Sequence, residues 1–251
     1  MAIQIIPKSR QGYGAFNGGE IIENKPIGFP QDGGEAKPYS NLFYWAYAKA
    51  LKDSTIGLHP HQGFEIMTFV LNGTIRHFDT KLNAWEPLKK GDAQIIRAGN
   101  GISHAEHMDK DAVMFQIWVD PNLNETLGKK ASYNNYQSED FPVSKEENLS
   151  IKSYAGNNAP LTMDAPGLEI LEWTFENSFS KKLNPEKIYS IYVMEGDVEI
   201  DENKVEQDSF VILKDVEKIE VVGNGKFFVI ASDKKLNYKT YNEMMQERMR
   251  R

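Results

Sequence analysis

The sequence predicts an all-β protein made of two strand-rich halves, on three observations. Short segments alternate apolar and polar residues over about five to eight positions and stop at Gly, Asn or Asp, which is the pattern of strands in a sandwich or barrel. FVLNGTI and YVMEGDV align at Gly73 and Gly196 with apolar residues in the same flanking positions, which indicates a duplicated unit. Helical periodicity is confined to a weak stretch at 122–130 and a tail from about 238 to 251.

The first half contains the clearest strand pattern, at 65–79. Its centre is Asn72-Gly73, a dipeptide that tolerates the positive φ angles of a type I′ turn, so we expect two antiparallel strands to meet there. Further strands are predicted at 92–98, after the turn KKGD, and at 112–119.

The second half begins after a polar region that follows Pro121, which we interpret as an inter-domain connection with a loop-rich entry. Strands resume at 188–222, with a turn at Gly196. We therefore expect one domain over residues 1–135 and a second over 136–251, which ends in the helical tail.

Composition narrows the possible functions. The 251 residues include no cysteine, so disulfides and thiolate metal ligands are excluded and any metal must be held by nitrogen and oxygen atoms. A formal net charge of −7 disfavours direct nucleic-acid binding. No apolar run approaches the roughly 20 residues of a membrane span, and the first residues lack a signal-peptide pattern, so we expect a cytoplasmic protein with no membrane contact.

The histidines point to a metal site in the first half. All five lie within 49 consecutive positions: His59, His61, His77, His104 and His107. At the same offsets before Gly196 as His59 and His61 have before Gly73, the second half carries Lys182 and Asn184. A metal is therefore expected in the N-terminal half alone.

The sequence spacing favours two pairs of candidate metal ligands whose side chains can converge. Residues i and i+2 of a strand face the same side, so His59 and His61 can meet at one point if the segment is extended, and Pro60 disfavours a helix there. His104 and Glu106 repeat this spacing behind a glycine-rich stretch. Three imidazoles and a carboxylate suit Fe, Mn, Ni, Cu or Zn and leave two octahedral positions open.

Two histidines have other expected roles. For His77 we expect a hydrogen bond with Asp79 or with a cross-strand neighbour. His107 points away from Glu106 in an extended strand, and it competes with His104 only if the segment bulges.

The motifs HPHQGFE, KKGD, AGNGISHAEHM and FQIWVDPN, together with Gly73, resemble the pirin family of the cupin superfamily in order and approximate spacing. The resemblance implies a bicupin of two antiparallel β-barrel (jelly-roll) domains, with iron in the N-terminal one and a second domain without metal ligands. It also implies the ligand set His59, His61, His104 and Glu106. Fe(II) is the metal that the resemblance favours, with Mn, Ni, Cu or Zn as alternatives.

Two positions complicate the transfer from the family. Glu65 has the spacing of the glutamate ligand of typical cupins, although the longer match around Glu106 favours Glu106 and leaves Glu65 a supporting or structural role. Gln62 stands where the family often has arginine, which removes a cation beside the site. The opening of the chain also departs from the common pirin start.

The resemblance implies two functions from different classes. In one, the protein is a dioxygenase similar to quercetin 2,3-dioxygenases, which open a flavonol ring with O2 and release carbon monoxide; Glu106 would be the catalytic proton acceptor. In the other, it is a redox-responsive module that binds a protein partner through the same iron site. A metal-binding cupin isomerase or storage-like protein is a third alternative. We expect a monomer, with pocket residues from Phe64, Met67, Met114, Gln116 and Trp118.

Overall fold

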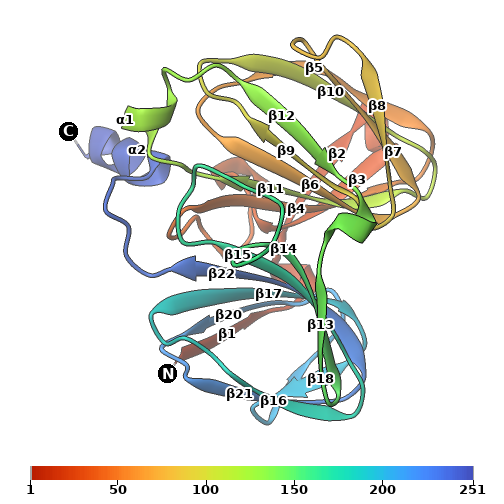
Figure 1. Ribbon diagram of the computed structural model, residues 1–251, viewed down its shortest axis with the longest axis vertical. Helices are drawn as coiled ribbons and strands as arrows, with labels where there is room; N and C mark the ends of the chain where they lie inside the picture. Colours follow the sequence, from red (N-terminus) through yellow and green to blue (C-terminus); the bar gives the residue numbers. More distant parts are fainter. Residues whose placement is uncertain (1, 251) are drawn as a thin grey trace. The chain divides into compact units, whose positions relative to one another are not determined.

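The computed structural model describes residues 2–250 and divides the chain into two compact units. The histidine unit comprises Gln11–Ser138, Met163–Pro166 and the chain from Leu236 onward. The histidine-free unit comprises the chain up to Arg10, Glu139–Thr162 and Gly167–Lys235. Each unit is built from a seven-stranded and a four-stranded antiparallel sheet (Figure 1).

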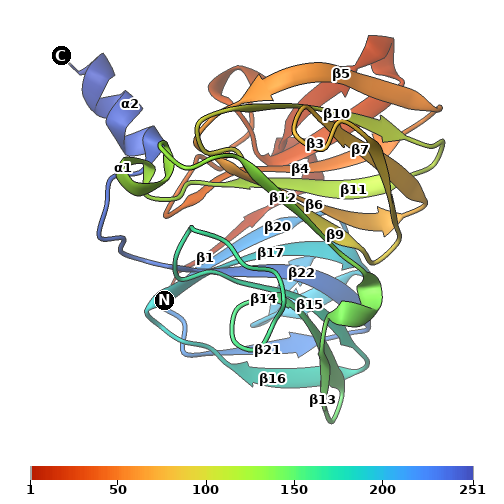
Figure 2. The same ribbon diagram turned by 45° about the horizontal axis from the view of Figure 1, so that its top comes forward.

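The larger sheet of the histidine unit has the strand order β12-β9-β6-β11-β4-β3-β2, and the smaller one has the order β5-β10-β7-β8. In sequence order the strands are β2 Gly12–Phe16, β3 Ile21–Ile27, β4 Leu42–Ala50, β5 Ser54–His61, β6 Glu65–Asn72, β7 Thr74–Asp79, β8 Trp85–Lys89, β9 Ala93–Arg97, β10 Ile102–Met108, β11 Val113–Val119 and β12 Ser132–Tyr136. This unit also holds the helices α1 Leu123–Thr126 and α2 Tyr241–Met249, which lie side by side in both views (Figures 1 and 2).

The histidine-free unit repeats this arrangement with the orders β1-β20-β17-β22-β15-β14-β13 and β16-β21-β18-β19. Its strands are β1 Ala2–Ile6, β13 Val143–Glu146, β14 Leu149–Ala155, β15 Glu169–Phe175, β16 Ser178–Lys182, β17 Lys187–Glu195, β18 Val198–Ile200, β19 Asn203–Val205, β20 Phe210–Lys214, β21 Lys218–Val222 and β22 Gly225–Asp233. Short 3-10 turns occupy Lys8–Arg10, Asn17–Gly19, Pro30–Asp32 and Ser138–Asp140. The matching sheet orders confirm the predicted all-β, two-barrel fold.

Each end of the chain belongs to the unit that is formed mainly by the other half of the sequence. Strand β1 pairs with β20 at the sheet edge that β12 occupies beside β9 in the histidine unit. The last helix, in turn, belongs to the histidine unit. Division of the chain into domains 1–135 and 136–251 stays a prediction, and the compact units exchange both ends of the chain across that boundary.

The hairpin predicted at Asn72-Gly73 is wrong. Strand β6 pairs with β9 and β11, whereas β7 pairs with β8 and β10 in the other sheet. Asn72 ends β6, and Gly73, with φ +71°, is where the chain crosses from one sheet to the other. A Cβ at Gly73 would meet Ala112 Cα at 3.0 Å, so the crossing needs glycine for its conformation and its space.

The Gly196 position repeats this crossing between β17 and β18, with φ +86°. The aligned glycines therefore mark equivalent points of the two units. Other differences concern missed elements. The polar region after Pro121 contains β12, β13 and β14, and the first 50 residues contain β1 to β4.

The two barrels differ in what fills them. The histidine-free unit holds a continuous apolar cluster that includes Trp173, Ile191, Ile219, Val221 and Phe227. The histidine unit has smaller apolar clusters, and buried polar side chains lie between its sheets. Among residues 2–250, no helix is long and apolar enough to cross a membrane.

Candidate metal centre

Strands β5 and β10 of the smaller sheet carry the predicted ligand residues. Both are extended and antiparallel, and their register places His104 directly opposite His59 and Ile102 opposite His61. The register shifts between His104 and Glu106, which is a bulge of the kind that redirects side chains. The spacing argument was therefore correct in treating the HPH segment as a strand.

The three histidines His59, His61 and His104 converge. Each offers one imidazole nitrogen, and these nitrogens lie within 4.8 Å of one another. The ring centroids are 4.8 Å apart for His59 and His61, 4.4 Å for His59 and His104, and 4.7 Å for His61 and His104. Three ring nitrogens gathered in this way can all bind one first-row metal ion.

The hydrogen bonds leave these nitrogens available. His59 Nδ1 lies 2.7 Å from the carbonyl oxygen of Gly57, which can only accept, so Nδ1 carries the proton and Nε2 has a free lone pair. Within residues 2–250, the buried Nε2 of His61 and both ring nitrogens of His104 have no hydrogen-bond partner. Buried polar atoms are normally paired, so these nitrogens fit a site for a metal ion.

The charge state of the imidazoles also suits metal binding. Burial, followed by the neighbouring His104 and His59, lowers the pKa of His61 to about 3. Burial, followed by the nearby His59, lowers the pKa of His104 to about 2. Both imidazoles are therefore neutral at pH 7, which is the form that binds metals.

The group of imidazole nitrogens that lie within 4.8 Å of one another does not include the carboxylate of Glu106. Its charge acts on His61, whose pKa it raises slightly against the larger opposing effects. The side chain is 1% exposed, and Gln116 Nε2 donates to both of its oxygens at 2.8 Å. Glu106 as a fourth ligand stays a prediction.

Glu65, the competing carboxylate, has a different role. Its oxygens accept hydrogen bonds from the backbone N–H groups of Asp164 and Ala165, each at 2.7 Å, and Arg97 Nε lies 3.7 Å away. Burial raises its pKa to about 7, although the two N–H groups act in the opposite direction. Glu65 therefore anchors the segment Met163–Pro166 to its barrel.

His77 and His107 both lie outside the group of three. His77 is fully buried and its Nε2 lies 2.9 Å from Asp79 Oδ2, which confirms the predicted hydrogen bond. Its ring stacks on Tyr133, with centroids 4.4 Å apart. His107 Nδ1 pairs with Thr55 Oγ1 at 2.8 Å, on the other side of the strand from the site.

His61 also borders a groove. The groove has neutral walls, formed by Pro60, His61, Gln62, Thr80, Asn100, Gly101, Ile102 and Ser103. Gln62, which stands where the family often has arginine, donates to the carbonyl oxygen of Asn100 at 3.3 Å. Its amide side chain therefore forms part of the edge of this groove.

Aromatic side chains form the other side of the site. The Trp118 ring lies 4.8 Å from the His61 ring, and Phe64 and Phe43 follow at 5.7 and 6.5 Å from Trp118. Two other pocket candidates lie elsewhere: Met114 belongs to an apolar cluster, and Met67 is fully buried on the opposite face of β6 from Thr68.

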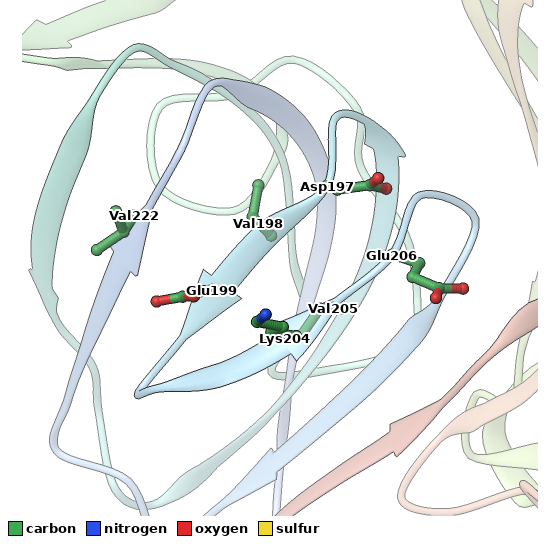
Figure 3. Close-up of a pocket in the computed structure, with 7 residues that line it drawn as sticks. All are labelled: Asp197, Val198, Glu199, Lys204, Val205, Glu206 and Val222. Carbon is green, nitrogen blue, oxygen red and sulfur yellow. The ribbon is translucent and has the colours of Figure 1, made fainter.

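The histidine-free unit offers different chemistry. A groove at its β18–β19 hairpin is lined by Asp197, Val198, Glu199, Lys204, Val205, Glu206 and Val222 (Figure 3). None of these lining residues is an imidazole. The apolar core of this unit fills the space that the buried polar residues occupy in the histidine unit.

Comparison with known proteins finds a family match for part of the chain. Residues 35–119 match the family model named Pirin. This part of the chain is similar to pirins. This confirms the family predicted from the HPH and HxE motifs, both of which lie within the matched residues.

Individual relatives agree with this pirin assignment. The chain is 41% identical over 71 residues to the quercetin 2,3-dioxygenase of Escherichia coli K12, which covers 27% of this chain and 30% of the relative. It is 30% identical over 146 residues to Pirin-1 of Arabidopsis thaliana, which covers 55% of this chain and 50% of the relative. These alignments thus span half or less of either relative's own length.

A solved pirin shows the shared fold. The crystal structure of the bacterial pirin YhhW from Escherichia coli, in complex with nickel(II), superposes with a TM-score of 0.75 and 22% identity. The match covers 92% of this chain and 99% of that one. At this identity the likeness establishes the fold, the same bicupin fold that the pirin motifs imply.

Three residues near the candidate site escaped prediction from the sequence. Thr68, Gln94 and Tyr133 form a hydrogen-bonded series that ends at Glu106. Thr68 in EIMTFVLN and Gln94 in AQIIR are polar side chains in otherwise apolar strands. A buried polar residue at an inward position of such a strand was the available signal.

Proposed function

We propose that this protein holds one metal ion, preferably Fe(II), on His59, His61, His104 and Glu106. Support comes from the buried, unpaired ring nitrogens and from the neutral state of His61 and His104. A bound iron ion would supply two open coordination positions and redox chemistry with dioxygen.

The proposed reaction is that of a quercetin 2,3-dioxygenase, which opens a flavonol ring with dioxygen and releases carbon monoxide. A relative that shares 41% identity over 71 residues carries this name. The aromatic wall of Trp118, Phe64 and Phe43 beside His61 suits the flat rings of a flavonol. Convergence of this wall and the three imidazoles is the observation that carries the proposal.

The protein's own residues have defined roles in this reaction. The groove beside His61 admits the substrate, and the Trp118 face orients its ring next to the imidazoles. As proton acceptor for the substrate hydroxyl, Glu106 would have to be loosened or displaced from coordination first, because coordination to a cation weakens a base.

The test is flavonol consumption by protein loaded anaerobically with Fe(II) and then exposed to O2. Loss of flavonol together with carbon monoxide release is expected for the wild type and for His107→Ala, whose side chain faces away from the site. His104→Ala should abolish both signals. Full iron loading without consumption of any flavonol in a panel would exclude this substrate class and favour a regulatory, partner-binding role.

A further inference from the structure

A row of polar side chains crosses the interior face of the larger sheet of the histidine unit. The strand register places Gln94 on β9 and Gln116 on β11 directly opposite Thr68 on β6. Thr68 and Gln94 are fully buried, and Gln116 is 8% exposed. Three neighbouring polar residues in a buried barrel interior require partners, and Thr68 and Gln116 share Glu106 from the other sheet as theirs.

One arm of this arrangement reaches Glu106 through Thr68. The Tyr133 hydroxyl, whose single hydrogen can go to Asn135 Oδ1 or to Gln94 Oε1, lies 3.0 Å from the latter. Gln94 Nε2 lies 3.0 Å from Thr68 Oγ1, to which it donates. Because Thr68 Oγ1 already accepts that bond, its own hydrogen is free to point at Glu106 Oε1, 3.4 Å away. Gln94 and Thr68 thus both donate in the direction of the carboxylate.

The second arm is Gln116. The Trp118 indole N–H, which can only donate, lies 3.4 Å from Gln116 Oε1 and fixes the orientation of the amide. The Nε2 group therefore faces Glu106 and lies 2.8 Å from each carboxylate oxygen. Equal distances place this nitrogen on the bisector of the two oxygens, where a chelated ion would otherwise lie.

The carboxylate of Glu106 has a limited number of lone-pair positions that can accept a hydrogen bond or bind a metal. An ionised carboxylate has about four of them, two on each oxygen. Gln116 uses one on each oxygen of Glu106, and Thr68 uses the second on Oε1. One position on Oε2 remains.

We infer that Gln116 and Thr68 form a seat that restricts Glu106 to single-oxygen coordination. This inference rests on the proposed metal site. With three imidazole nitrogens and one carboxylate oxygen, an octahedral ion keeps two positions open, whereas a chelating carboxylate would leave one. Gln116 and Thr68 are therefore positioning residues that preserve the second open position, the one needed for a substrate that binds through two oxygens.

The test uses Mn(II)-loaded protein and the relaxation rate of solvent water, which increases with the number of water molecules on the ion. Gln116→Met keeps the side-chain length and removes the amide donor, so Glu106 becomes free to chelate. We expect the relaxation enhancement to fall about twofold, from two open positions to one. Thr68→Val, which conserves side-chain shape, should also lower the relaxation enhancement. This variant replaces Gln116→Met in the test if Gln116→Met does not fold.

Controls separate this effect from general disturbance of the barrel. Met114→Leu changes the same face of β11 two residues away from Gln116 and should leave the relaxation rate unchanged, since Met114 packs in an apolar cluster. In a Glu106→Gln background, Gln116→Met should add nothing, because the carboxylate it acts through is gone.

Three outcomes would overturn the inference, and two of them concern the proposed ligand set as well. An unchanged relaxation rate in Gln116→Met and Thr68→Val would show that no seat limits coordination. Wild-type Mn(II) affinity in Glu106→Gln, with affinity lost in His104→Ala, would show that Glu106 is not a ligand and leave the imidazole site intact. Wild-type affinity in His104→Ala would remove the metal site itself.

Discussion

The buried carboxylate of Glu65 should make the stability of the histidine unit depend on pH. Its side chain is 1% exposed, and burial raises its pKa from 4.5 to about 7. A group whose pKa is raised in the folded state contributes stability that is fully present below the unfolded pKa and is lost as pH rises through the folded pKa. The window is therefore about pH 4.5 to pH 7.

The size of the effect follows from the shift. A difference of about 2.5 pKa units corresponds to about 3 kcal/mol, at 1.36 kcal/mol per unit. Glu65→Gln cannot ionise, so the stability of the wild type relative to this variant should fall by about 3 kcal/mol between pH 4.5 and pH 8.5. The glutamine also leaves one backbone N–H of Asp164 or Ala165 facing an amide N–H, which costs roughly 1–3 kcal/mol at every pH.

Urea unfolding of the metal-free protein, followed by tryptophan fluorescence, measures this difference. Three of the four tryptophans, Trp45, Trp85 and Trp118, lie in the histidine unit, so the signal reports mainly on that unit. Glu125→Gln, at an exposed glutamate on α1, is the control and should show no such trend. Parallel stability curves for the wild type and Glu65→Gln across pH would refute the reasoning.

Two further predictions concern the backbone of the same unit. Gly73→Ala should lower the free energy of unfolding by roughly 1–3 kcal/mol, because φ is +71° and the new Cβ would meet Ala112; Gly128→Ala, in open space, should stay within about 0.5 kcal/mol of the wild type in the same urea assay. Thr240→Ala removes the side chain that accepts from the Glu243 N–H at the start of α2, so it should cost about 1 kcal/mol and speed proteolysis of the tail; unchanged cleavage rates would contradict this.

The strand pattern and the histidine spacing predicted a large part of this structure. Alternation located β9 and β11, and the i, i+2 rule placed His59 and His61 on one face of an extended segment, to which the pairing of β5 with β10 brings His104. These features depend on local conformation, which local sequence governs.

Pairing between distant segments could not be predicted in the same way. The alternation around Gly73 suits a hairpin and a crossing between sheets equally well, and only the partners β9, β10 and β11 decide between them. Glu65 depends on N–H groups about 100 residues further along the chain. The seat of Glu106 likewise requires the register of β9, β6 and β11, which no short motif reports.

Elemental analysis of the protein purified without added metal tests the central claim most directly. The wild type and His107→Ala should each retain about one ion per chain, because His107 pairs with Thr55 away from the cluster. His104→Ala should lose that ion, since it removes one of three convergent ring nitrogens. Metal at wild-type stoichiometry in His104→Ala would contradict the account.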